Sequence, residues 1–102
     1  MNSSGTIEPG WVPVPSPHVC AAFLDDEAVL YDVRTARPVL LNTTAAAVWA
    51  TIDGVLTVAQ ISSVLADRYA TDPGTVAPDV EHAIDRFGAL GLLAGQGASP
   101  PD

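Results

Sequence analysis

The sequence has few cysteines, few basic residues and no long hydrophobic run. A single cysteine, Cys20, cannot form an internal disulfide and fits a reducing compartment. Four basic residues, all arginine, stand against 12 acidic ones, for a net charge of -8. Because nucleic acids and anionic membranes attract Lys and Arg, this balance argues against both as partners. No stretch approaches the ~18 apolar residues of a membrane span, and residues 1–8 lack the features of a signal peptide, so we expect a cytoplasmic protein.

The composition predicts one small folded domain with unstructured ends. The 102 residues are 48% hydrophobic, enough to form a core. Residues 1–16 are rich in Gly, Pro and Ser, which predicts an extended or disordered arm, although Trp11 within it is expected to dock on another surface. Residues 95–102 predict a disordered tail, which leaves residues 17–94 as the domain.

Three short strands are predicted in the first half of the domain. The short apolar runs at residues 18–24, 28–33 and 37–41 each contain at least one valine, and their β-branched content and flanking turns favour strands over helices. The acidic turn at 25–27 and the polar link at 34–36 separate them. Such short links favour an antiparallel meander.

Apolar residues with helical spacing predict two helices after the strands. The first is capped by Asn42 or Thr43 and stops near Gly54. The second starts with a capping box formed by Thr57 and Gln60. The apolar positions of the two faces are Ala45, Val48, Trp49 and Ile52, and then Val58, Ile61, Val64, Leu65 and Tyr69.

A third helix is predicted to begin near Ala77, because Pro78 fits only a first turn, and to end at Gly91. Three strands followed by three helices indicate an α+β domain of winged-helix type. We expect the core to contain Leu30, Leu41, Val48, Trp49, Ile52, Ile61, Leu65, Ile84, Phe87 and Leu90.

The sequence offers little that would support catalysis, and we expect no catalytic, metal or cofactor site. His18, Cys20 and His82 are the candidates for metal binding or a Cys–His dyad, but no motif frames them. Instead of a metal site or a dyad, we expect an exposed histidine and a small buried thiol. The acidic residues 25–27 lack a calcium-loop pattern and are expected to form a solvated turn. No glycine-rich phosphate loop follows a strand.

The third strand, residues 37–41, is an outer strand of the predicted meander. Its unpaired backbone groups would accept an extended peptide as a fourth strand, and a third helix beside it would complete a groove. Either face of the strand is open as the one that meets the ligand. Pro38 removes one backbone donor, so pairing must use Val39 onward or a register that spares Pro38.

The order and spacing of several short motifs resemble the PqqD-like family, the RiPP recognition elements of ribosomal peptide-natural-product pathways. The similarity extends over about residues 17–93. The motifs are Val29-Leu-Tyr-Asp32, Leu41-Asn42-x-Thr44-Ala45, Val48-Trp49, Asp53-Gly54, Thr57-Val58-x-x-Ile61, Asp79-Val80 and Leu90-Gly91-Leu92-Leu93.

The resemblance implies a non-catalytic domain that binds the leader of a precursor peptide and presents it to a maturation enzyme, such as a radical SAM enzyme, a leader peptidase or a cyclase. The implied cleft lies between the third strand and the third helix, with Asp79 and Asp85 near its rim. The residues implied for peptide binding are Arg37, Pro38, Val39, Leu40 and Leu41 on the strand, and Asp79, Val80, Ala83, Ile84 and Phe87 on the helix.

Two further expectations concern charge and the competing function. The acidic surface predicts a leader with Lys or Arg near the rim. The alternative function is a winged-helix regulator or a structural subunit that acts through protein contacts. Carboxylates at Asp79, Glu81 and Asp85 argue against a third helix that reads a DNA groove.

Overall fold

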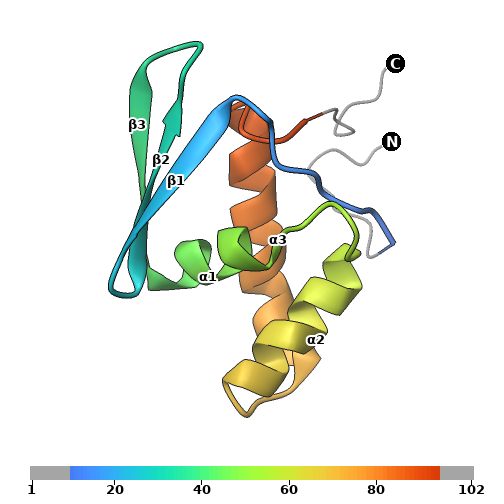
Figure 1. Cartoon of the computed structure of the whole chain (residues 1–102). Helices are drawn as coiled ribbons and strands as arrows, with labels where there is room; N and C mark the ends of the chain where they lie inside the picture. Colours follow the sequence, from blue (N-terminus) through green and yellow to red (C-terminus); the bar gives the residue numbers. More distant parts are fainter. Residues whose placement is uncertain (1–9, 95–102) are drawn as a thin grey trace.

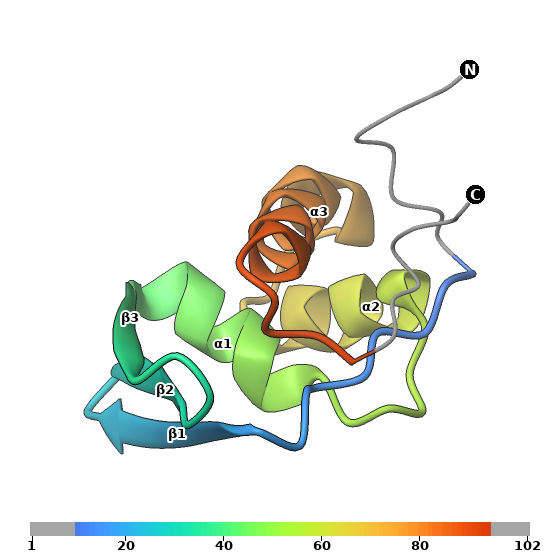
Figure 2. The same cartoon turned by 90° about the horizontal axis from the view of Figure 1, so that it is seen from above.

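The computed structural model describes residues 10–94 of the chain. A three-stranded antiparallel sheet precedes three helices, which confirms the predicted α+β class. Figures 1 and 2 show the sheet on one side of the molecule, with α1 between the sheet and α3. The elements are β1 (Val19–Leu24), β2 (Glu27–Asp32), β3 (Arg37–Leu41), α1 (Thr43–Thr51), α2 (Val58–Arg68) and α3 (Pro73–Ala89).

The sheet is the predicted meander, with strand order β1-β2-β3. β2 is central and pairs antiparallel with both neighbours, so β1 and β3 are the edges. The two turns are tight because Asp25 and Ala36 adopt positive φ angles of 58° and 57°. Each strand begins and ends within one residue of its predicted position.

The first two helices begin at the predicted caps. The Asn42 side chain accepts a hydrogen bond from the Ala45 amide at 2.9 Å. Thr57 and Gln60 form the capping box, with bonds of 2.8 and 3.1 Å between each side chain and the other residue's amide. Gly54, at φ 80°, turns the chain after α1.

The third helix starts earlier than the sequence pattern predicts, at Pro73 rather than near Ala77. Pro78 therefore lies inside α3, where the sequence reading placed it in a first turn. The missing amide of Pro78 leaves only the Gly74 carbonyl without its helical partner, and Gly74 and Pro78 are both exposed to water. Burial of Val76, 9% exposed, holds this first part of the helix on the core.

The core lies between the three helices and the face of the sheet that α1 covers. Nine of the ten predicted core residues are buried, and the exception is Leu90, which is 46% exposed. Leu90 caps α3, and Gly91, at φ 75°, redirects the chain so that Leu92 returns to the core in its place. Trp49 and Phe87 meet edge to face, with ring centroids 5.3 Å apart.

Residues 10–16, the described part of the predicted arm, lie against the domain. The Val58 amide donates to the Trp11 carbonyl at 2.8 Å, and the Ser16 amide donates to the Leu92 carbonyl at 2.9 Å. Figures 1 and 2 place this segment, drawn in blue, on the side of the molecule away from β3. The rest of the predicted arm, residues 1–9, and the predicted tail, residues 95–102, lie outside the described residues.

Candidate peptide-binding site at the edge of the sheet

The backbone of β3 presents a free edge, and the register decides which residues face it. The Val33 amide donates to the His18 carbonyl, so Val33 points toward β1. Asp32 therefore points toward β3, where its carbonyl accepts from Ala36 at 2.8 Å. Because directions alternate along a strand, the β3 residues opposite Asp32, Leu30 and Ala28 pair with β2.

It follows that Pro38 and Leu40 point their backbone groups away from the sheet. Pro38 has no amide hydrogen, but because its backbone faces away from β2, the pairing of β3 with β2 loses no hydrogen bond. Within β3 the free edge then offers one donor, the Leu40 amide, and two acceptors, the carbonyls of Pro38 and Leu40. An added strand has to register on Leu40.

The side chains of β3 divide between a covered and an exposed face. Leu41 is 2% exposed and Val39 is half-buried, and both belong to the face that α1 covers. Pro38 and Leu40 belong to the opposite, outer face, and Leu40 is 73% exposed. The outer face of the three strands, defined by the cross-strand pairs, carries Cys20, Ala22, Leu24, Glu27, Val29, Tyr31, Pro38 and Leu40.

A hollow of about 320 Å³ opens at one end of this edge. It lies where the β1–β2 turn approaches the junction of β3 and α1, and one residue of α3 reaches it. A hollow of this size can take one or two side chains of a peptide. Its lining residues are Leu24, Glu27, Ala28, Val29, Leu40, Leu41, Asn42 and Arg86.

The structure brings only part of the predicted site together at this hollow. Leu40 and Leu41 line it, whereas Arg37 is exposed at the start of β3 and Asp79 is exposed on α3 outside the lining. The other four helix residues are between 0 and 6% exposed, because α3 packs its apolar face on α1 and α2. These four core residues, which do not form an open surface, are Val80, Ala83, Ile84 and Phe87.

Sequence reasoning missed Arg86, Leu24 and Val29 as lining residues. Arg86 follows Asp79 by seven positions and so shares its side of α3, and this spacing was the one signal in the sequence that grouped Arg86 with the predicted site. Leu24 and Val29 reach the hollow through the pairing of strands, since Val29 lies directly opposite Leu40 in the register. Their apolar character in the sequence was indistinguishable from that of core residues.

The residues considered for metal or nucleophilic chemistry do not form a site in the described structure. Within residues 10–94 no three His, Cys, Asp or Glu side chains are grouped to hold a metal ion. Cys20 is exposed, so the expected buried thiol is wrong. The reason is that β1 is an edge strand and the Cys20 side chain lies on its outer face. None of the helices in this part of the chain is long and apolar enough to cross a membrane.

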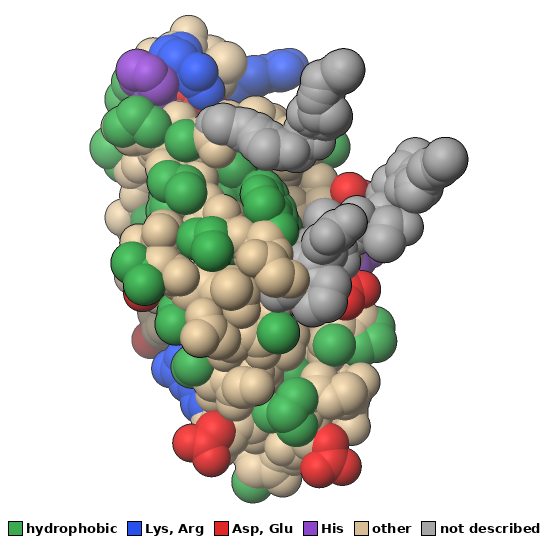
Figure 3. Space-filling model, turned by 90° about the vertical axis from the view of Figure 1, so that its right-hand side faces the viewer, with side chains coloured by type: hydrophobic (Ala, Val, Ile, Leu, Met, Phe, Trp, Pro, Cys, Tyr) green, Lys and Arg blue, Asp and Glu red, His purple; other side chains and the backbone are tan. Residues whose placement is uncertain are grey.

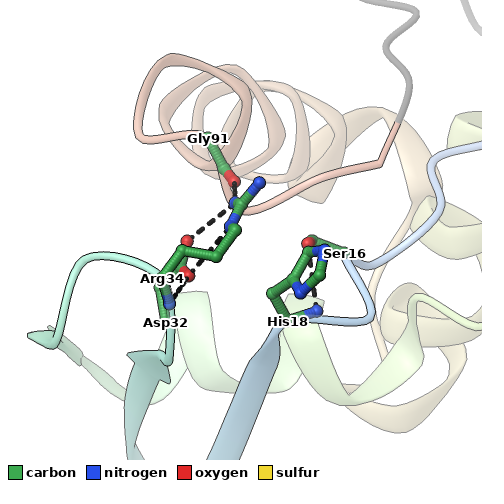
Figure 4. A network of polar contacts seen from close by, with 5 residues as sticks. All are labelled: Ser16, His18, Asp32, Arg34 and Gly91. Carbon is green, nitrogen blue, oxygen red and sulfur yellow. Dashed lines mark hydrogen bonds and ion pairs between the residues drawn. The ribbon is translucent and has the colours of Figure 1, made fainter.

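A polar network joins the β2–β3 turn to the end of α3 (Figure 4). Arg34 donates through Nη2 to Asp32 Oδ2 at 2.8 Å and to the Gly91 carbonyl at 3.2 Å. It also donates through Nε and its backbone amide to Asp32 Oδ1, at 3.1 and 2.8 Å. These bonds, the side-chain ones first, lower the pKa of Asp32 to about 2. The network holds one end of β3 at a set position relative to α3.

The face of the molecule opposite β3 carries charged as well as hydrophobic side chains. Figure 3 shows acidic side chains at the lower end and the right-hand edge of this face, and basic side chains at its upper end and its lower left edge, with hydrophobic side chains scattered between them. No continuous basic stripe of the kind that follows a phosphate backbone is visible on this face.

Comparison with known proteins identifies the fold and the family model that fits the sequence. The family model of coenzyme PQQ synthesis protein D (PqqD) matches residues 27–93. The PqqD truncation of Methylobacterium extorquens PqqCD, solved by NMR and described as a functional and stand-alone RiPP recognition element, is 25% identical. Its TM-score is 0.74, and the alignment covers 89% of this chain and 97% of that one.

Two structures in complex with leader peptides have the same fold. TbiB1 in complex with the TbiA(beta) leader peptide is 24% identical, with a TM-score of 0.71 over 81% of this chain and 96% of that one. A lasso peptide synthetase B1 complexed with the leader peptide is 20% identical, with a TM-score of 0.69 over 83% and 100%. Among curated proteins, none matches this sequence significantly.

Proposed function

The chain belongs to the PqqD family, and from this premise we propose that it is a RiPP recognition element: a non-catalytic domain that binds the leader of a ribosomally made precursor peptide and presents it to a modifying enzyme. The observation that carries the proposal is the open edge of β3 beside a hollow of about 320 Å³. Leader-peptide complexes among proteins of this fold support it.

The leader binds as a fourth strand next to β3. Backbone pairing centres on Leu40, whose amide is the one donor that β3 offers on this side. A typical net hydrogen bond contributes about 0.5–1.5 kcal/mol, so three such groups supply modest and sequence-independent affinity. Selectivity comes from side chains that enter the hollow and contact Leu24, Val29 and Leu40.

The role of this domain in the pathway is to hold the precursor peptide and to deliver it to the modifying enzyme. Binding energy raises the local concentration of the precursor at the enzyme without any chemistry in this domain. The enzyme served is a radical SAM enzyme, a leader peptidase or a cyclase, as the resemblance implies. A weak, exposed binding edge suits such delivery, because the leader must leave after modification.

The first test is a fluorescence-anisotropy titration of the full chain with a labelled leader peptide from the precursor gene nearest to its own. Saturable binding with a Kd of about 10 μM or tighter, competed by unlabelled leader and not by a scrambled peptide, is expected. The absence of binding by the folded chain would contradict the proposal. Affinity for duplex DNA without affinity for leader would favour the regulator instead.

A pair of proline variants locates the bound strand. Leu40→Pro removes the free donor of β3 and is expected to weaken leader binding about tenfold. Phe23→Pro is the matched control, because by the same alternation Phe23 points its amide away from the sheet at the other edge, on β1. Binding that is lost in Phe23→Pro and kept in Leu40→Pro would move the site to β1.

A further inference from the structure

We propose that Arg86 makes the binding edge selective for a peptide that carries an aspartate or glutamate next to an apolar residue. The inference rests on the proposed function and names the class of peptide that the site takes. Arg86, on α3, lines the same hollow as Leu40 and Leu41. An arginine side chain therefore stands at the end of the β3 edge with which an added strand would pair.

Arg86 is the arginine available for this contact. The guanidinium of Arg34 is engaged by Asp32 and the Gly91 carbonyl. Arg37 lies at the other end of β3, and Arg68 lies in the last turn of α2. Of the chain's four basic residues, Arg86 alone lines the hollow.

The guanidinium of Arg86 is not neutralised within the described part of the chain. The ion pair found among residues 10–94 joins Arg34 to Asp32, and Arg86 is exposed. Glu27 lines the same hollow, yet its carboxylate is not within ion-pair distance of Arg86. A planar guanidinium with free donors binds a carboxylate through two parallel hydrogen bonds, and these bonds are stronger than neutral ones.

The geometry also specifies where the acidic residue stands in the peptide. Leu24, Val29 and Leu40 lie on the outer face of the sheet, while α3, which carries Arg86, packs on the helical side. Side chains of an extended peptide alternate between these two sides. An apolar residue that covers Leu40 therefore places its immediate neighbours, or residues three positions away, toward Arg86. The expected motif is an acidic residue at an odd spacing from an apolar one.

This inference reverses the expectation drawn from net charge. A charge of -8 favours basic peptides at long range, but salt screens exposed charges beyond about 8–10 Å. Contact with Arg86 is short-range and is screened less. The hollow thus selects an acidic side chain on a protein whose overall charge is acidic.

The test is a selection from a displayed library of random 12-residue peptides, with the full chain as the immobilised target. The expected winners carry Asp or Glu at an odd spacing from Leu, Ile, Val or Phe. Changing that acidic residue to its amide in a winning peptide should weaken binding by about five- to tenfold. Arg86→Glu should shift the selected residue to Lys or Arg.

Arg68→Glu is the matched control, because it makes the same change of charge at an exposed position in the last turn of α2. It should retain the acidic preference. Arg86 is exposed, so both variants are expected to keep the wild-type circular dichroism spectrum. Winners with apolar residues and no acidic bias, or the same bias in Arg86→Glu, would overturn the inference and leave the proposed function standing. A wild-type chain that enriches no peptide would contradict the proposed function, and the inference with it.

Discussion

The helices and the sheet of this domain use hydrophobic residues in opposite ways. In α3, Val80, Ile84 and Phe87 are at most 1% exposed. In β1, whose six residues are all apolar, Phe23 is 51% exposed and Leu24 is 62% exposed. The apolar content of the helices forms the core, whereas much of the apolar content of the sheet faces water.

The difference follows from how the layers are stacked. α1 packs on β2 and β3 and covers one face of the sheet. The outer face of the strands has Glu27 as its one charged residue, although the solvent face of an antiparallel sheet is usually polar. Exposed apolar surface of this kind is typical of an interaction site. The buried residues of the helices hold the fold, whereas the exposed apolar residues of the sheet remain available for a contact with a partner.

Truncation of one large side chain in α3 and one in β3 tests this difference most directly. Phe87→Ala should destabilise the domain by about 3–5 kcal/mol, because Phe87 is fully buried and contacts Trp49. Leu40→Ala should change the free energy of unfolding by less than about 0.5 kcal/mol, because Leu40 is 73% exposed. Urea unfolding followed by circular dichroism measures both. Equal losses would mean that Leu40 supports the core.

A second pair of variants compares the two sides of β3 itself. Val39→Pro removes an amide that pairs with Leu30 of β2, and is expected to cost about 1–3 kcal/mol. Leu40→Pro removes an amide that faces the free edge, and should be close to neutral for stability. The same urea titrations provide the measurement. If Leu40→Pro is the more damaging variant, the alternation assigned to β3 is wrong.

The smallest effect concerns the polar network that links the two halves. The pKa of Asp32 is lowered to about 2 in the folded protein, against about 3.9 in an unfolded chain. A lowered pKa stabilises the folded protein above pH ~4, and this contribution to stability is lost as the pH falls toward about 2. Asp32→Asn, or Arg34→Gln, should therefore flatten the dependence of the thermal midpoint on pH in that range. If the slope of the thermal midpoint against pH is unchanged in both variants, the pair of Asp32 and Arg34 does not make stability depend on pH.

Local features of the fold were predictable because they depend on neighbours in the sequence. Short apolar runs and the polar turns between them located the strands, and the side chains of Asn42 and Thr57 located two helix starts. The start of α3 was misjudged because burial of Val76 outweighs the bond that Pro78 removes. Leu90 was misplaced for a similar reason, since the turn at Gly91 brings Leu92 to the core instead.

The candidate site was predictable only in part. The sequence pointed to β3 as an outer strand, because short links predict a meander. The prediction also placed the apolar residues of α3 in the peptide-binding site. The apolar pattern of a helix face is the same whether that face packs in the core or contacts a ligand. Arg86 was not predicted as part of the site, because its place at the hollow depends on how α3 packs on α1 and α2.

The α+β class, the element order, two of the helix caps and most of the core could be read from the amino-acid sequence. These follow from periodicity and from hydrogen bonds between residues a few positions apart. Only the tertiary structure decided which backbone groups of β3 are free, which face of the sheet stays uncovered, and that Arg86 lies beside Leu40. Those outcomes depend on strand register and helix packing between distant segments, and no local pattern encodes which of two apolar faces will be buried.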